Sequence, residues 1–186
     1  MKLDEPTLWC TKLATERLEL HPTDPRHAAA MFVTLANPRI YTFIEDEPPT
    51  SVAELESRYQ RAQSRRSPDG EEGWFEWIVQ LAGEPIGYAQ ATISLKRAEI
   101  GIAYVFSPTV WGRGYATESG RAIMTHLDRL PGLARFLIDT DVDNIVSEKL
   151  ARKLGFELLE RRVGASTIRG ESRDDFRFVK RVQRRE

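Results

Sequence analysis

The stretch SPTVWGRGYATE, residues 107–118, lies between an apolar segment that ends at Phe106 and an amphipathic segment that begins at Tyr115. Gly112 and Gly114 fall where a helix is expected to begin. The N-terminus of a helix presents unpaired backbone N–H groups and the positive end of the helix dipole, and glycine lets an anion approach that backbone. The stretch therefore predicts a strand, a phosphate-binding loop and a helix.

Two glycines before a helix also fit a tight turn that binds nothing, and the glycines alone do not decide between the two interpretations. A dinucleotide-binding fingerprint fits less well. Its third glycine would stand at Thr117, and it should open the first strand–helix–strand unit rather than follow three strands.

Hydrophobic periodicity on either side of this stretch predicts an α/β fold. Alternating or continuous apolar runs predict strands over 15–21, 74–81, 86–94, 99–106, 135–140, 156–163 and 175–182. Three- and four-residue spacings predict helices over 25–36, 52–65, 115–130 and 145–154. The segment 74–81 is apolar on both sides and is expected to be a central strand. This order of elements predicts helices on both faces of one sheet.

Composition limits the class of protein. The 186 residues carry 27 Lys and Arg against 28 Asp and Glu, a balance that gives no general attraction to nucleic acid or to an anionic membrane. The single cysteine, Cys10, excludes an intramolecular disulfide, and no apolar run predicts a signal peptide or a membrane span. We expect one domain over residues 1–186, with a flexible start (1–12) and a tail (183–186), in the cytoplasm.

Two blocks of the sequence resemble a known family. Residues 111–116 are similar to the acetyl-CoA pyrophosphate loop of the GNAT acetyltransferases, Q/R-x-x-G-x-G/A, with Trp111 in the first position. Residues 144–147 and 153–156 resemble the N-x-x-S…K-x-G-F segment of the branch of ribosomal-protein N-terminal acetyltransferases. Shorter matches to that branch occur at 15–18, 85–87 and 99–101. The blocks occur in the same order as in the family, with the expected elements between them.

This resemblance implies an acetyl-CoA-dependent N-acetyltransferase with a three-layer α-β-α fold and a mixed, mostly antiparallel sheet of about seven strands. It implies that Asn144 bonds the pantetheine arm and that Ser147 lies near the thioester, although Asn144 and Gly155 also fit simple helix caps. The residues that the resemblance places against acetyl-CoA are Val105, Phe106, Trp111, Gly112, Arg113, Gly114, Tyr115, Ala116, Thr117, Asn144 and Ser147.

The sequence favours direct attack of an amine on the thioester. Cys10 and the three histidines form neither a nucleophile–base pair nor a metal-ligand cluster. Glu99 is the candidate base, or else an exposed carboxylate at a strand end. A backbone N–H near Val105 or Phe106 is the candidate oxyanion donor, where the family has a β-bulge and two splayed parallel strands.

Protonation of the leaving thiolate has no obvious donor. Family members often carry a tyrosine seven residues after the asparagine, but Ala151 stands there. Ser147 is the remaining hydroxyl in that block. A free thiol has a pKa of about 8.5, so the thiolate can also leave unaided near neutral pH.

The acceptor is expected to be an amine of low pKa. An α-amine with a pKa near 8 is about one-tenth neutral at pH 7, far more than a lysine amine. A protein N-terminus or a small amine such as a polyamine therefore fits. The segment 41–47 is expected to flank the acceptor, with Phe43 and Glu45 in contact with it, or to be a solvated loop.

Two further questions stay open. The protein is expected to be a monomer or a homodimer, with neither a nucleic-acid partner nor a membrane partner. The alternative function is a non-catalytic sensor that binds acyl-CoA, and retention of Glu99, Asn144 and Ser147 favours the enzyme over the sensor.

Overall fold

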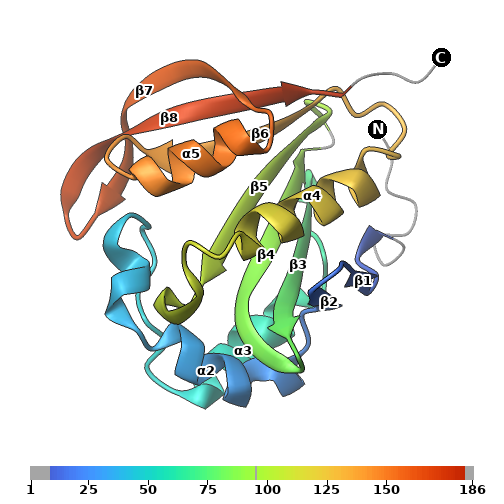
Figure 1. Cartoon of the computed structure of the whole chain (residues 1–186), viewed down its shortest axis with the longest axis vertical. Coiled ribbons are helices and arrows are strands. Elements are labelled where there is room, and N and C mark those ends of the chain that lie inside the picture. Colours follow the sequence, from blue (N-terminus) through green and yellow to red (C-terminus); the bar gives the residue numbers. More distant parts are fainter. Residues whose placement is uncertain (1–8, 95, 183–186) are drawn as a thin grey trace.

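The computed structural model describes residues 9–94 and 96–182. It contains one eight-stranded sheet in the order β1-β2-β3-β4-β5-β6-β8-β7 (Figure 1). The strands are β1 (Leu13–Ala14), β2 (Leu18–Pro22), β3 (Glu72–Leu81), β4 (Glu84–Ser94), β5 (Glu99–Phe106), β6 (Arg135–Asp141), β7 (Glu157–Ile168) and β8 (Glu171–Arg181). Only the β5–β6 pair is parallel, and every other neighbouring pair in the described sheet is antiparallel.

Helices cover both faces of this sheet, which confirms the predicted three-layer α-β-α architecture (Figure 1). The α-helices are α2 (Ala28–Leu35), α3 (Val52–Ala62), α4 (Tyr115–Leu127) and α5 (Ile145–Lys153). Short 3-10 helices are η1 (Pro25–His27), η2 (Pro38–Thr42) and η3 (Pro108–Val110). Alternate residues of β3 separate the two cores: Trp77 packs on the α4 side and Ile78 on the α2–α3 side.

The predicted elements lie where the sequence places them, with two additions. The two-residue β1 pairs with β2 at the sheet edge, which makes eight strands rather than about seven. The predicted connection 164–174 is instead the paired end of a β7–β8 hairpin. Its turn places Arg169 and Gly170 at positive φ, the backbone that a tight hairpin turn requires.

The prediction of a flexible start over 1–12 is wrong for its described part. Cys10 is buried, its thiol donates to the Glu76 carbonyl oxygen at 3.7 Å, and burial raises its pKa to about 11. The Trp77 indole donates to the Thr11 carbonyl oxygen at 2.8 Å. These contacts fix the chain ahead of β1. Residues 1–8 and the tail 183–186 lie outside the described residues.

The parallel β5–β6 pair opens towards one end of the sheet. Register pairs join only Glu99–Gly101 to Arg135–Leu137, although both strands continue beyond those residues. The predicted splay between two parallel strands is therefore present, and the gap lies beside the last residues of β5. Within the described ranges no helix is long and apolar enough to cross a membrane.

Candidate functional site

A cavity of about 500 Å³ opens at the end of β5. It collects residues from the β5–α4 connection, from the N-terminus of α5 and from the segment 39–44. Most of the predicted site residues line it: Phe43, Val105, Phe106, Trp111, Gly112, Gly114, Tyr115, Ala116, Thr117, Asn144 and Ser147. Segments up to about 100 residues apart in the sequence therefore meet at one place.

Residues 111–116, here called the glycine loop, have the backbone conformation that anion binding needs. Gly112 and Gly114 have φ values of +76° and +84°, a region that side chains with a Cβ adopt at a cost. Gly114 is the N-cap residue of α4 and provides no side-chain cap. The N–H groups of the first turn of α4 therefore remain available to an anion in the cavity, where the helix dipole is positive.

Trp111 anchors this loop to the end of β5. Its indole N–H donates to the Phe106 carbonyl oxygen at 2.8 Å, and the Arg39 guanidinium lies 5.4 Å from the centre of its ring. Trp111 thus contributes a structural contact at the position where the family motif has Gln or Arg.

Glu118, in the first turn of α4, ties the loop to the start of the sheet. Its carboxylate accepts from Thr15 Oγ1 at 2.6 Å, from the Arg17 backbone N–H at 3.0 Å and from Arg17 Nε at 2.7 Å. Arg17 also donates to the Arg113 carbonyl oxygen at 3.2 Å. Burial acts to raise the pKa of Glu118, but the hydrogen bonds from Thr15 and Arg17 outweigh it and lower that pKa. This contact gives a physical role to the motif at 15–18.

The backbone of β5 presents a donor to the β5–β6 gap. The Ser107 N–H donates to the Ile86 carbonyl oxygen at 2.8 Å, at the pair next to Gly87–Phe106. Because an antiparallel ladder alternates its bonds, the Phe106 N–H turns away from β4 and towards the gap, whereas Val105 pairs with Tyr88. The geometry favours Phe106 over Val105 as the oxyanion donor.

The β-bulge implied by the resemblance does not occur in the described β4–β5 pair, whose register is continuous from Gly87–Phe106 to Ser94–Glu99. Instead, the backbones of β4 and β5 approach each other closely at Gly87. A Cβ at Gly87 would lie 2.2 Å from the Val105 carbonyl oxygen, so only glycine fits there.

The N-terminus of α5 brings the Ser147 hydroxyl to the cavity. Asn144 caps the helix by accepting from the Ser147 backbone N–H at 3.1 Å. Ser147 Oγ lies 2.8 Å from the Tyr104 hydroxyl, and both side chains line the cavity. Ala151 is fully buried and contributes no polar group.

Sequence reasoning missed Tyr104. No family motif covers it, but strand alternation was a usable signal, since Tyr104 shares a face of β5 with Phe106. Burial raises the pKa of Tyr104 to about 12, with the Ser147 hydrogen bond acting in the opposite direction.

The structure contradicts the expected role of Glu99 as the base. Its carboxylate is buried and pairs with Arg135, through a 2.8 Å bond from Nε and a second contact, and with Arg97 at 3.2 Å. Glu99 and Phe106 stand at opposite ends of β5, about 23 Å apart for a strand of 8 residues. Glu99 is also not the exposed carboxylate of the alternative interpretation.

The acidic segment 45–47 is partly engaged by the protein itself. Glu45 accepts from the Thr167 backbone N–H at 2.5 Å and joins this loop to β7, while Asp46 pairs with Arg58 at 2.6 Å. Glu45 does not line the cavity, whereas Phe43 does. The structure therefore leaves less free negative charge beside the cavity than the sequence indicates.

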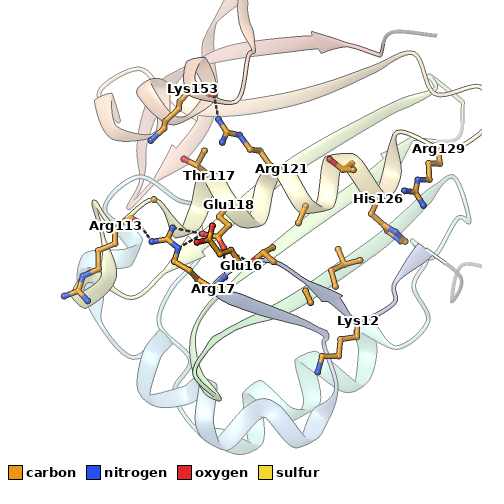
Figure 2. A pocket seen from close by; sticks show the side chains of 16 residues that line it. Lys12, Glu16, Arg17, Arg113, Thr117, Glu118, Arg121, His126, Arg129 and Lys153 are labelled. Atoms are coloured by element: carbon orange, nitrogen blue, oxygen red, sulfur yellow. Dashed lines mark hydrogen bonds and ion pairs between the residues drawn. The ribbon is translucent and has the colours of Figure 1, made fainter. Parts of the chain in front are cut away.

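A second, shallow cavity of about 780 Å³ follows the outer face of α4 (Figure 2). Six cationic side chains line it against two carboxylates, Glu16 and Glu118. The cationic residues are Lys12, Arg17, Arg113, Arg121, Arg129 and Lys153. Arg113, expected in the pyrophosphate site, lines this cavity instead of the first. Gly114, Thr117 and Lys153 line both, so the two cavities meet at the N-terminus of α4.

Across residues 9–94 and 96–182, no group of three or more His, Cys, Asp or Glu side chains is arranged to hold a metal ion. His126 is partly buried, and its Nε2 lies 3.0 Å from the Trp9 carbonyl oxygen.

Comparison with solved structures shows a shared fold. The RimL ribosomal L7/L12 alpha-N-protein acetyltransferase in complex with coenzyme A is 23% identical, with a TM-score of 0.81 over 92% of this chain and 98% of that one. An acetyltransferase from Salmonella typhimurium that modifies the N-terminal serine of protein L7/L12 is 23% identical, with a TM-score of 0.79 over 91% and 97%. The microcin C7 self-immunity acetyltransferase MccE, solved with acetyl-CoA and AMP, is 16% identical, with a TM-score of 0.80 over 90% and 94%.

Family assignment rests on the sequence model. No curated protein matches the chain. The model of the acetyltransferase (GNAT) domain matches residues 17–157, which include β5, the glycine loop, α4 and α5. The chain belongs to the GNAT acetyltransferase family.

Proposed function

We propose that this protein is an acetyl-CoA-dependent N-acetyltransferase that transfers an acetyl group directly from the thioester to a primary amine. The β5–β6 gap, which opens onto the glycine loop of α4, carries this proposal. A gap of this kind accepts an extended arm along a strand edge, and the loop beside it supplies backbone donors for phosphate groups.

The residues of both cavities fit acetyl-CoA, the donor that this family uses. The first turn of α4, which follows the N-cap residue Gly114, is suited to the pyrophosphate. Arg113, Arg121 and Lys153 lie around the same helix end and are suited to the remaining phosphate. Asn144 and the free edge of β5 are suited to the pantetheine arm, which places the thioester near Ser147.

Direct transfer needs a neutral amine, a donor for the oxyanion and a proton for the sulfur. The Phe106 N–H is the proposed oxyanion donor, since the alternation of the ladder turns it towards the gap. Ser147 is the proposed hydroxyl at the sulfur. An α-amine needs no strong base, because about one-tenth of it is already neutral at pH 7.

The proposed acceptor is a protein or peptide N-terminus or a small-molecule amine. Two structural relatives act on the N-terminus of protein L7/L12, but at 23% identity they support the fold more than the acceptor. The cavity adds Phe43 and Ile44 on the side of the α2–α3 connection, an apolar surface against which an acceptor can pack.

The test is acetyl-CoA-dependent thiol release by purified protein against three amine panels: peptides with free N-termini, polyamines, and other small amines. We expect release with one panel and a mass increase of one acetyl group on that amine. Binding of acetyl-CoA without transfer to any panel would contradict the enzyme and support the acyl-CoA sensor.

A further inference from the structure

Tyr104 and Ser147 form a hydroxyl pair inside the acetyl-CoA cavity. Their oxygen atoms are 2.8 Å apart, and both side chains line the space between the end of β5 and the start of α5. The two residues are 43 positions apart in the sequence, so the pair exists only through the fold. Ser147 is held independently by the Asn144 cap at its backbone N–H.

The direction of this hydrogen bond follows from acidity. A phenol is a far stronger acid than an alkyl hydroxyl, so Tyr104 is the better donor and Ser147 Oγ the acceptor. The Ser147 hydrogen is then free to point into the cavity. Ser147 Oγ keeps one further lone pair, which can accept from an N–H group.

Tyr104 itself is a poor source of the proton. Burial raises its pKa to about 12, whereas a free thiol has a pKa of about 8.5. Complete transfer of the proton from Tyr104 to the thiolate is therefore unfavourable. Tyr104 stays protonated at every working pH and acts as a permanent hydrogen-bond donor.

We propose that Tyr104 is a positioning residue for the acetyl transfer, whose hydroxyl donates to Ser147 Oγ and directs the Ser147 O–H towards the thioester sulfur. This inference rests on the proposed function. As the carbon–sulfur bond breaks, sulfur takes the Ser147 proton, and Ser147 takes the proton that the attacking nitrogen loses. The new carbon–nitrogen bond remains, and neither Ser147 nor Tyr104 changes charge.

The first test compares Tyr104→Phe, Ser147→Ala and the double variant with wild type. Tyr104→Phe is expected to lower kcat about tenfold and to change the KM for acetyl-CoA by less than about twofold. The double variant is expected to be no slower than Ser147→Ala alone, because Tyr104 acts only through Ser147. Tyr59→Phe is the matched control: Tyr59 is buried on α3, and its hydroxyl has no partner among the described residues. An unchanged kcat in Tyr104→Phe, or losses that multiply in the double variant, would overturn the proposal.

A second readout needs no acceptor. The thiol pKa of bound CoA is measured from the ultraviolet absorbance of its thiolate. A directed Ser147 O–H stabilises the thiolate, so in wild type the pKa of the bound CoA thiol is expected to lie below that of free CoA measured in the same way. In Tyr104→Phe the pKa of the bound thiol is expected to be higher than in wild type by about half a unit or more. Equal thiol pKa values in wild type and Tyr104→Phe would contradict the positioning role. Failure of wild type to bind CoA would instead overturn the proposed function, so the two failures are distinguishable.

Discussion

At the scale of single residues, the glycine loop depends on a carboxylate outside the family's glycine motif. Glu118 accepts three hydrogen bonds from Thr15 and Arg17. Arg17 also donates a hydrogen bond to the Arg113 carbonyl oxygen. The Glu118 side chain is 18% exposed, so solvent screens this contact only in part. The position of the loop is thus set from the β1–β2 connection, about 100 residues earlier in the chain.

We expect Glu118→Gln to destabilise the protein by about 1–2 kcal/mol, because it weakens charge-assisted bonds to Thr15 and Arg17. For a chain of this size that lowers Tm by about 2–8 °C. Acetyl-CoA should also bind more weakly, as measured by calorimetry. Glu148→Gln is the control, a first-turn carboxylate of α5 in an exposed pair with Arg152.

The same contact predicts a direction for pH dependence. The folded-state pKa of Glu118 lies below its ordinary value of 4.5. Its contribution to stability is therefore fully present above pH 4.5 and is lost as the pH falls through the lower, folded-state pKa. The Tm difference between wild type and Glu118→Gln should be constant from pH 6 to 8 and shrink in acid. A difference that grows in acid would contradict this assignment.

Glu99 belongs to the stability of the sheet rather than to the chemistry. Its pairs with Arg97 and Arg135 join β5 to β6 at the closed end of the parallel pair. Because both arginines are about half exposed, Glu99→Gln should cost only about 1 kcal/mol. The pH profile of kcat/KM should match that of wild type. Loss of a profile limb in Glu99→Gln would restore Glu99 as the base.

At the scale of elements, two helix N-termini and one strand end meet at the cavity. Residues at the starts of α4 and α5 line it, and β5 lies between them with an edge that β6 leaves free. The open edge exists because β6 pairs with β5 over three residues only. Positive helix ends beside unpaired strand amides make this an electropositive region of the backbone, suited to a developing oxyanion.

The position of the β5 end depends on Gly87. Because a Cβ there would lie 2.2 Å from the Val105 carbonyl oxygen, Gly87→Ala should push β5 outwards and destabilise the protein by about 1–3 kcal/mol. Acetyl-CoA affinity should fall with it. Gly101→Ala, on the neighbouring strand β5, is the control, since its Cβ would meet only the Thr92 carbonyl oxygen at 3.9 Å. Equal Tm values for the two variants would contradict this account.

At the scale of the whole molecule, periodicity was enough to predict the layers and most element positions. The four helices and the order of strands follow from local apolar spacing, which the sequence displays directly. The β7–β8 hairpin was underestimated because its middle is polar and exposed and carries Gly164, so no alternation indicates a strand. Its pairing is decided by the Arg169–Gly170 turn and by the length of β8.

The residues of the candidate site likewise fall into those that the sequence predicted and those that it did not. Residues that act through their backbone or their motif, such as Gly114 and Asn144, were found from the sequence and lie together in the cavity. Residues whose role depends on strand register were not: Tyr104 was missed, and Glu99 was predicted to be the base although it stands at the end of β5 opposite Phe106. A sequence shows that a residue lies on a strand but not which end faces the ligand.

Charge is also distributed in a way that the composition hides. The whole chain has a net charge of −1, yet six cationic side chains and only two carboxylates line the cavity along α4 (Figure 2). The excess of positive charge adjoins the glycine loop, as expected for the phosphate site proposed above.

The most direct test of the account is the affinity of acetyl-CoA for wild type, Gly114→Ala and Gly114→Glu, measured by calorimetry. Both variants place a Cβ at φ +84°, so Gly114→Ala reports the backbone strain alone. Wild type should bind, Gly114→Ala should bind up to about tenfold more weakly, and Gly114→Glu should show no binding because its carboxylate repels the pyrophosphate. Affinity in Gly114→Glu equal to that in Gly114→Ala would contradict the placement of acetyl-CoA at the start of α4.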